Sequence, residues 1–124
     1  MTTLIPNLPK IQGVKVLIIQ LFQNLIYNAI KFRRDEPLKI EISVEESPTF
    51  YTFRVQDNGR GISIENQDKI FQPFSKLETI TITQGTGLGL TICEKIVKKH
   101  FGKIWVKSEY GSRTTFYFTI KKTK

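Results

Sequence analysis

The fold is decided by residues 38–61, which read LKIEISVEESPTFYTFRVQDNGRG. Apolar and polar residues alternate over residues 38–46, which is the pattern of a strand with one buried face. Ser47 and Pro48 predict a turn, and residues 50–55 predict the antiparallel partner of the first strand. Two glycines close to the end of the stretch break the second strand. These residues therefore predict a β-hairpin that ends in a glycine-rich loop.

The rest of the chain predicts helices and strands on either side of this hairpin. Residues 15–32 are largely apolar and free of Gly and Pro, as expected of a helix. The remaining elements are expected, in order, as a short strand and an irregular lead-in over residues 3–12, a short helix at 65–70, a helix at 91–100 that Gly102 ends, and strands at 103–109 and 114–121. This order predicts an α/β (α+β) two-layer sandwich, in which about three helices cover one face of a mixed, mostly antiparallel sheet of about five strands. With no repeat or linker in the sequence, we expect a single domain over residues 1–124.

Composition and charge restrict the function classes. The chain has 19 Lys and Arg against 11 Asp and Glu, a net charge of +8 that favours an anionic partner, and residues 91–124 hold nine of the basic and two of the acidic residues. Cys93 and His100 are the only residues of their types, so neither an internal disulfide nor a zinc site within the chain is expected. No apolar stretch has the length of about 18 residues that a membrane helix needs. We therefore expect a cytoplasmic domain without direct membrane insertion, from a parent protein that is either soluble or membrane-anchored.

The helix over residues 15–32 has one polar stripe. Gln20, Asn24, Asn28 and Lys31 fall within about 80° of one another at the helical rotation of about 100° per residue. The stripe is either the solvated face of an amphipathic helix or a site, and two Asn one turn apart favour the site because Asn is a mediocre helix former. Neutral oxygen ligands beside an ammonium group would suit a hydrated Mg²⁺ ion and the phosphates that it binds.

The loop Asp57-Asn58-Gly59-Arg60-Gly61 follows the second strand of the hairpin. It is either a tight turn or an acceptor site, and the two readings are about equally supported by these residues alone. A carboxylate between a strand end and two glycines can accept a hydrogen bond from the exocyclic amine of a flat ring.

A second glycine-rich segment, Gly85-Thr86-Gly87-Leu88-Gly89-Leu90, opens the helix at 91–100. Its backbone N–H groups and the helix N-terminus can face an anion such as a phosphate. The spacing G-x-G-x-G differs from the dinucleotide-binding G-x-G-x-x-G, and no Gly-Lys-Ser/Thr of a Walker loop follows. The segment therefore predicts a phosphate cradle of neither of those types.

Together these segments resemble the catalytic, ATP-binding domain of sensor histidine kinases, which has the Bergerat fold. The resemblance rests on four boxes in order, namely residues 20–32 (N box), 57–62 (G1 box), 70–74 (F box) and 85–90 (G2 box), and it covers nearly the whole chain. It implies that Asn28 coordinates Mg²⁺ with Asn24 beside it, and that Lys31 contacts the phosphates of ATP. The nucleotide-binding residues that it implies are Asp57, Gly59, Gly61, Ile62, Phe71, Phe74, Lys76, Gly85, Thr86, Gly87, Leu88, Gly89 and Thr115.

Some of these implied roles are specific. Asp57 would accept from the adenine amino group, with Gly61 letting the ring lie close and Thr115 near the adenine. Phe71 and Phe74 would anchor a flap over the nucleotide, although plain core packing is an equal alternative for both.

The resemblance implies transfer of the γ-phosphate of Mg²⁺-ATP to a histidine of a separate dimerisation and phosphoacceptor domain. Related ATPases that hydrolyse ATP have a Glu where this chain has Asn24, and a neutral amide cannot take a proton from water. His100 precedes Phe101 and not an acidic residue, so we interpret it as structural and expect a catalytic domain cut from a longer kinase.

Its expected partners are the phosphoacceptor domain of the parent kinase and an acidic response-regulator receiver, not nucleic acid. Two alternatives are a non-kinase ATPase of the same fold and a nucleic-acid-binding module. The basic module would combine Lys95, Lys98, Lys99, Lys103 and Lys107 with Phe101 and Trp105.

Overall fold

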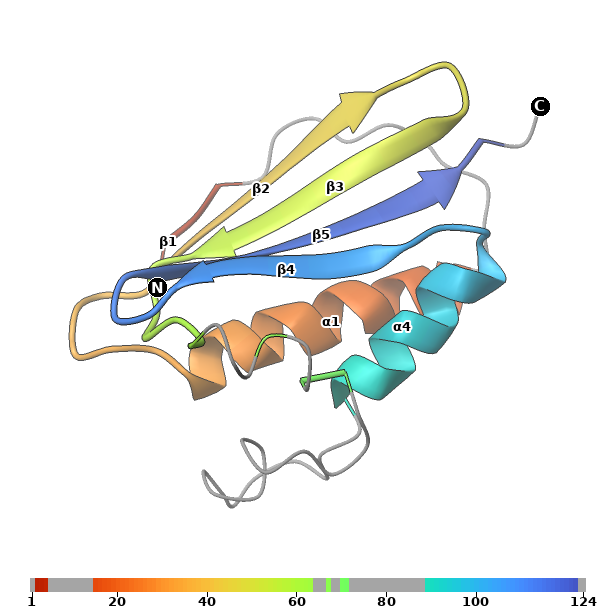
Figure 1. Cartoon of the computed structure of the whole chain (residues 1–124). Helices are drawn as coiled ribbons and strands as arrows, with labels where there is room; N and C mark the ends of the chain where they lie inside the picture. Colours follow the sequence, from red (N-terminus) through yellow and green to blue (C-terminus); the bar gives the residue numbers. More distant parts are fainter. Residues whose placement is uncertain (1, 5–14, 64–66, 68–69, 72–88, 123–124) are drawn as a thin grey trace.

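A computed structural model of the chain describes residues 2–4, 15–63, 67, 70–71 and 89–122, and in these it has a five-stranded sheet and two helices (Figure 1). The elements in order are β1 (Thr2–Leu4), α1 (Lys15–Lys31), β2 (Lys39–Glu46), β3 (Phe50–Asp57), α4 (Gly89–Lys99), β4 (Ile104–Glu109) and β5 (Arg113–Lys121). The strands and helices predicted from the sequence over these residues are confirmed, with ends that differ by at most two residues. The short helix predicted at 65–70 falls largely outside the described residues.

The sheet is mixed and mostly antiparallel, as predicted. Its strand order is β1-β2-β3-β5-β4; β1 pairs with β2 in parallel, and the other pairs are antiparallel. The register places Ile40 opposite Asp57, and Asp57 opposite Thr114. Since side chains directly opposite one another in a sheet share a face, these three lie in one row on one face.

Both helices lie on the same face of the sheet and pack against each other, which makes the two-layer sandwich (Figure 1). The alternation of β2, β3 and β5 turns one set of apolar side chains toward the helices. An aromatic cluster lies at the centre of the core: Phe53 and Phe118 stack at 4.9 Å between ring centroids, and Phe22 of α1 meets both edge-on. The buried core consists of Leu21, Leu25, Ala29, Leu38, Ile40, Ile42, Phe53, Val55, Ile62, Ile70, Leu90, Cys93, Ile96, Val97, Phe116, Phe118 and Ile120.

The C-terminal end of α4 differs from the prediction in one detail. The residue in the left-handed conformation is Phe101, with φ of 61°, and not Gly102. Gly102 is required for a different reason, because a Cβ at this position would overlap the backbone carbonyl of Thr119 on β5. Among the described residues, no helix is both long and apolar enough to cross a membrane.

Candidate functional site

Asp57 closes β3 at the helix-covered face of the sheet. Its side chain is 7% exposed, and Oδ1 accepts a hydrogen bond of 2.8 Å from Gly59 N. Burial raises the pKa of the carboxyl from 3.8 to about 6, and the hydrogen bond from Gly59 opposes the rise. Asp57 is therefore an anion at neutral pH in a place that is poorly solvated, which makes it a strong acceptor for a donor that replaces water.

The loop after Asp57 is fastened to the end of α1. A Cβ at Gly59 would lie 2.8 Å from both Asp57 Oδ1 and the Phe32 carbonyl oxygen, so only glycine lets the loop approach this closely. Arg60 N donates to the same carbonyl at 3.0 Å, and the Arg60 guanidinium lies 5.2 Å from the centre of the Phe32 ring. Phe32 N in turn donates to Asn28 O. The loop and the turn of α1 that contains Asn28 are thus joined through Phe32.

Asn58 has a structural role that the sequence analysis did not assign. Its Oδ1 accepts from Lys39 N at 2.8 Å, and its Nδ2 donates to Pro37 O at 3.0 Å. Arg34 Nε donates to Asn58 O at 2.9 Å. Asn58 therefore holds the connection between α1 and β2 against the loop, as Asx side chains in turns commonly do.

Gly61 and Ile62 attach the other end of the loop to β4. Gly61 has φ of 76°, and a Cβ would overlap the backbone carbonyl of Glu109. The need for glycine at this position is thus explained by packing against the β4–β5 turn, whereas the sequence analysis explained it by the approach of a ring. Ile62 is buried, and its N donates to Ser108 Oγ at 2.7 Å.

Gln67 is a further residue that sequence reasoning missed. Its Nε2 donates to Ile62 O at 2.9 Å and to Ser108 O at 3.1 Å, so one amide joins the loop to β4. No sequence signal indicates this, because a Gln five residues beyond the G1 box has no recognisable pattern.

The second and third residues of β5, Thr114 and Thr115, point to opposite faces of the sheet. Thr114 is opposite Asp57, is 5% exposed, and its Oγ1 lies 2.9 Å from Ser108 Oγ. Thr115, which the sequence analysis placed near the adenine, lies on the other face and donates to Gln56 Oε1 at 3.1 Å. The structure therefore does not bring Thr115 to Asp57. Its neighbour Thr114 occupies that place, since successive residues of a strand alternate in direction.

Asn28 and Asn24 have different surroundings on α1. Asn28 is 7% exposed. Asn24 is half-buried next to Cys93 of α4, and its Nδ2 is buried with no hydrogen-bond partner among the described residues. Burial raises the pKa of the Cys93 thiol to about 12, and the Asn24 side chain opposes the rise. Asn24 therefore faces the contact between the two helices.

The polar stripe of α1 is not its most exposed face. Gln20, Asn24 and Lys31 are half-buried, and Asn28 is buried. The exposed stripe instead contains Val16, Ile19, Gln23 and Tyr27. This burial favours a site over a fully solvated face for the stripe. The Lys31 ammonium lies 5.4 Å from the centre of the Phe32 ring, at the end of α1 to which the loop is fastened.

The F and G2 boxes are described only at their ends. The Phe71 ring meets Phe116 edge-on at 6.3 Å, and Phe71 O accepts from Thr91 Oγ1 at 2.8 Å, so Phe71 packs on the core. Gly89 is the first residue of α4, and a Cβ there would meet nothing within 4 Å in the described part of the chain. The predictions for Phe74, Lys76, Gly85, Thr86, Gly87 and Leu88 lie outside the described residues.

Asn28 suits a magnesium ion that arrives with a nucleotide. The described residues contain no group of three or more His, Cys, Asp or Glu that could hold a metal ion. Mg²⁺ keeps several waters and is usually held by one or two protein oxygens together with substrate phosphates, so a single buried amide oxygen fits that chemistry.

The structure separates the residues of the basic module that was considered as an alternative. Lys95, Lys98 and Lys99 are exposed on α4, whereas Trp105 lies on the face of the sheet turned away from the helices. His100 is buried, with Nδ1 2.8 Å from Ile96 O in the preceding turn, which agrees with a structural role.

The fold is that of histidine kinase catalytic domains. The structure matches the catalytic domain of histidine kinase ThkA with a TM-score of 0.76 and 39% identity, over 91% of this chain and 71% of that chain. It also matches full-length ShkA, solved in complex with AMPPNP, with a TM-score of 0.79 and 26% identity, over 94% of this chain and 24% of that chain. These likenesses place the chain in the class of histidine kinase catalytic domains.

Residues 13–124 match the family described as "Histidine kinase-, DNA gyrase B-, and HSP90-like ATPase", and the chain belongs to this family. It is 48% identical over 113 residues to cyanobacterial phytochrome A of Nostoc sp., which covers 91% of this chain and 15% of that protein. The chain thus spans about a seventh of the length of this curated relative.

Proposed function

We propose that residues 1–124 form one catalytic domain that binds Mg²⁺-ATP and transfers the γ-phosphate to a histidine imidazole on a separate dimerisation and phosphoacceptor domain. Membership of the family and the likeness to a kinase solved with AMPPNP support nucleotide binding. The observation on which the proposal depends most is Asp57, a buried carboxylate at the end of β3 that is held by Gly59.

Asp57 would select the adenine ring. With Oδ1 held by Gly59 N, the carboxylate is oriented to accept a hydrogen bond from the exocyclic amine of adenine. Thr114 lies opposite Asp57 in the sheet and could add a hydroxyl to the same edge of the ring. Since the pKa of Asp57 is about 6, the acceptor is ionised at cytoplasmic pH and protonates in mild acid, which predicts weaker ATP binding below about pH 6.

Asn28 and Lys31 would hold the phosphates together with the metal ion. Asn28 would supply an amide oxygen to Mg²⁺, and Lys31 would place its ammonium on a phosphate. The metal ion would neutralise charge that develops on the phosphates during transfer. The N-terminus of α4, which begins at Gly89, would add favourable polarity for the anion, with Lys76, Phe74 and residues 85–88 as further predicted contacts.

The absence of an acidic residue from α1 favours transfer to histidine over hydrolysis. The sequence of α1 contains no Asp or Glu, and the residue one turn before Asn28 is Asn24. Attack by water needs a base to remove a proton, whereas the unprotonated nitrogen of a neutral imidazole can attack directly. Asn24 would then act by positioning α1 against α4 and not as a base.

The partners follow from this chemistry. The nucleophile would come from the phosphoacceptor domain of the parent kinase, and an acidic receiver domain of a response regulator would take the phosphoryl group from that histidine. The cytoplasmic location and the absence of a nucleic-acid partner stay predictions.

Phosphotransfer between separate domains tests the proposal. The chain would be mixed with radiolabelled Mg²⁺-ATP and a separately purified phosphoacceptor domain from a related phytochrome kinase, and the label on that domain would be followed over time. Asn28→Ala should abolish transfer, and Gln23→Ala, on the exposed stripe of the same helix, should leave it unchanged. Undiminished transfer by a folded Asn28→Ala protein would refute the metal-binding role, and release of inorganic phosphate without transfer would indicate an ATPase instead.

A further inference from the structure

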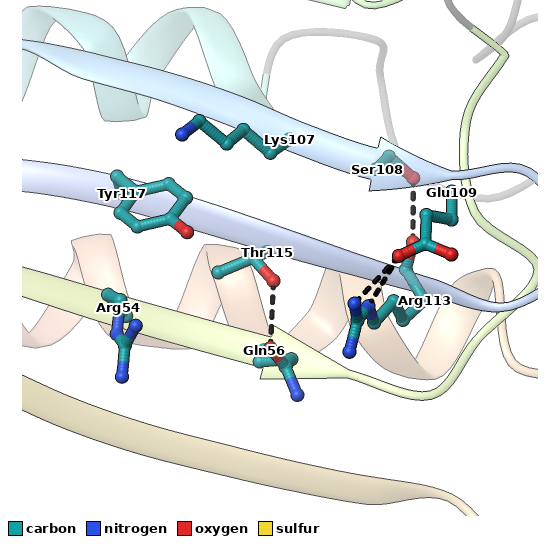
Figure 2. A pocket seen from close by; sticks show the side chains of 8 residues that line it. All are labelled: Arg54, Gln56, Lys107, Ser108, Glu109, Arg113, Thr115 and Tyr117. Carbon is teal, nitrogen blue, oxygen red and sulfur yellow. Dashed lines mark hydrogen bonds and ion pairs between the residues drawn. The ribbon is translucent and has the colours of Figure 1, made fainter.

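The face of the sheet turned away from the helices contains an open groove. Its volume is about 370 Å³, and its lining side chains come from β3, β4 and β5 (Figure 2). Arg54 lies between Phe53 and Val55, whose side chains are buried under the helices, so Arg54 and the groove are on the opposite face from Asp57. The groove is therefore separate from the candidate nucleotide site.

The groove has an excess of positive charge. Arg54 of β3, Lys107 of β4 and Arg113 of β5 are its basic residues, and Glu109 is its acidic one. Arg113 is paired with Glu109, since Nε and Nη2 lie 3.0 and 2.7 Å from the same Oε1. This pair is electrically neutral, so the net charge of the groove comes from Arg54 and Lys107, both of which are exposed.

The polar groups of the groove are mainly donors. Arg54 Nε donates to Ser43 Oγ at 3.1 Å, which orients the rest of the guanidinium over the sheet. Gln56 Oε1 accepts from Thr115 Oγ1, so the Nε2 group of Gln56 remains a donor. A guanidinium, an ammonium and an amide N–H₂ together fit a ligand that only accepts hydrogen bonds, which is the property of a carboxylate.

The aromatic side chains of this face contact one another. Tyr117 stacks on Trp105 with 5.3 Å between ring centroids and 1° between ring planes, and the Lys107 ammonium lies 5.5 Å from the centre of the Tyr117 ring. Ring surface that is already covered from within the chain is less available for stacking with a nucleobase. This arrangement favours carboxylates over nucleic acid as the anionic ligand.

We propose that this groove is a docking surface for a carboxylate-rich segment of a partner protein. Figure 2 shows Lys107 and Arg54 on either side of Tyr117, and β5 lies between their strands in the sheet. Arg54 pairs with Tyr117 and Lys107 pairs with Thr115, so their backbones are offset by two residues as well as by two inter-strand spacings of about 5 Å each. A segment with several Asp or Glu residues can contact both cations at once. The proposal does not depend on the nucleotide site, because it uses the other face of the sheet.

Peptide binding to the full chain tests this docking surface. A fluorescein-labelled oligo-glutamate peptide would be titrated by fluorescence anisotropy at low salt, against wild type and the double variant Arg54→Glu/Lys107→Glu. A matched control is Lys95→Glu/Lys98→Glu, which changes the net charge equally on the exposed side of α4. We expect the groove variant to weaken peptide binding about tenfold or more and the control variant to weaken it about threefold or less. Both variants lose the same long-range electrostatic attraction, but only the groove variant loses direct contacts with the peptide.

Three outcomes would overturn the proposal. They are equal losses in the two charge-reversed variants, no detectable binding of the peptide to wild type, and tighter binding of a single-stranded oligonucleotide than of the peptide through the same two residues. The neutral pair Arg54→Gln/Lys107→Gln should show a smaller loss in the same direction if the reversed variant is unstable. Mg²⁺-ATP binding should be unchanged in all these variants, so a failure of the nucleotide proposal would be recognised separately.

Discussion

Replacing Asp57 by Asn should stabilise the protein and at the same time abolish nucleotide binding. The carboxyl of Asp57 has a pKa of about 6 in the fold against an ordinary value of 3.8, because burial disfavours its charged form. The folded state therefore binds this proton more tightly than the unfolded state does. An Asn at this position is neutral at every pH and can still accept the hydrogen bond from Gly59 N.

The sign and size of the effect follow from the two pKa values. Below pH 3.8 the group is protonated in both states and ionisation costs nothing. Ionisation of the buried carboxyl lowers the free energy of unfolding progressively as the pH rises from 3.8 toward 6. Above pH 6 the loss is complete and amounts to about 3 kcal/mol, at about 1.4 kcal/mol per pKa unit. The extra amide N–H₂ of Asn costs about 1 kcal/mol if it finds no partner, so we expect a net gain of about 2 kcal/mol near neutral pH.

Urea unfolding of wild type and Asp57→Asn at several pH values measures this difference. The midpoint of the variant should be higher by about 1 M near pH 7.5, and the difference should vanish toward pH 4. Asp35→Asn, which removes an exposed carboxylate between α1 and β2, is the matched control and should show no such trend. A gain that is the same at all pH values, or no gain near neutral pH, would refute the assignment of Asp57 as a buried, destabilised anion.

Three further predictions concern the surroundings of this site. Gly61→Ala should lower the free energy of unfolding by about 2–4 kcal/mol in thermal or urea unfolding, because it forces a side chain into a left-handed conformation against Glu109, and an unchanged stability would contradict that packing. Thr114→Val should weaken Mg²⁺-ATP binding by about 3- to 10-fold in a calorimetric titration, whereas Thr115→Val should change it about twofold or less. A larger loss in Thr115→Val than in Thr114→Val would contradict the assignment of Thr114 to the nucleotide site. Asn24→Leu should raise the free energy of unfolding by about 1 kcal/mol, because it removes a buried N–H₂ group without a partner in the described residues, and a loss of stability would point to a hydrogen bond that this account lacks.

The sequence predicted the elements of the fold well where the signal is local. Alternation over residues 38–46 and the uninterrupted apolar run of α1 are properties of short windows, and both elements were found within one residue of the prediction. The end of β3 was predicted two residues short, because Gln56 and Asp57 are held in the sheet by pairing with Thr115 and Thr114 of a distant strand. The parallel pairing of β1 with β2 is likewise a tertiary contact that three residues cannot indicate.

The sequence predicted which segments form the candidate site, but it could not predict which way their side chains point. Thr114 and Thr115 are adjacent and chemically identical, and the register of β5 against β3 alone decides which one faces Asp57. The helical periodicity of α1 grouped Asn24 with Asn28, yet it could not show that α4 would pack against Asn24 through Cys93. Gln67 and Asn58 act through hydrogen bonds to backbone groups, most of them far away in the sequence, so no local pattern indicates their roles.

A calorimetric titration with Mg²⁺-ATP and Mg²⁺-GTP tests the central claim that Asp57 recognises the adenine amino group. We predict that wild type binds ATP and discriminates strongly against GTP, which presents a carbonyl oxygen where adenine has its amine. Folded Asp57→Asn should lose ATP binding, because its amide no longer supplies an ionised acceptor. ATP binding of equal strength in wild type and Asp57→Asn, or equal binding of the two nucleotides to wild type, would contradict the account.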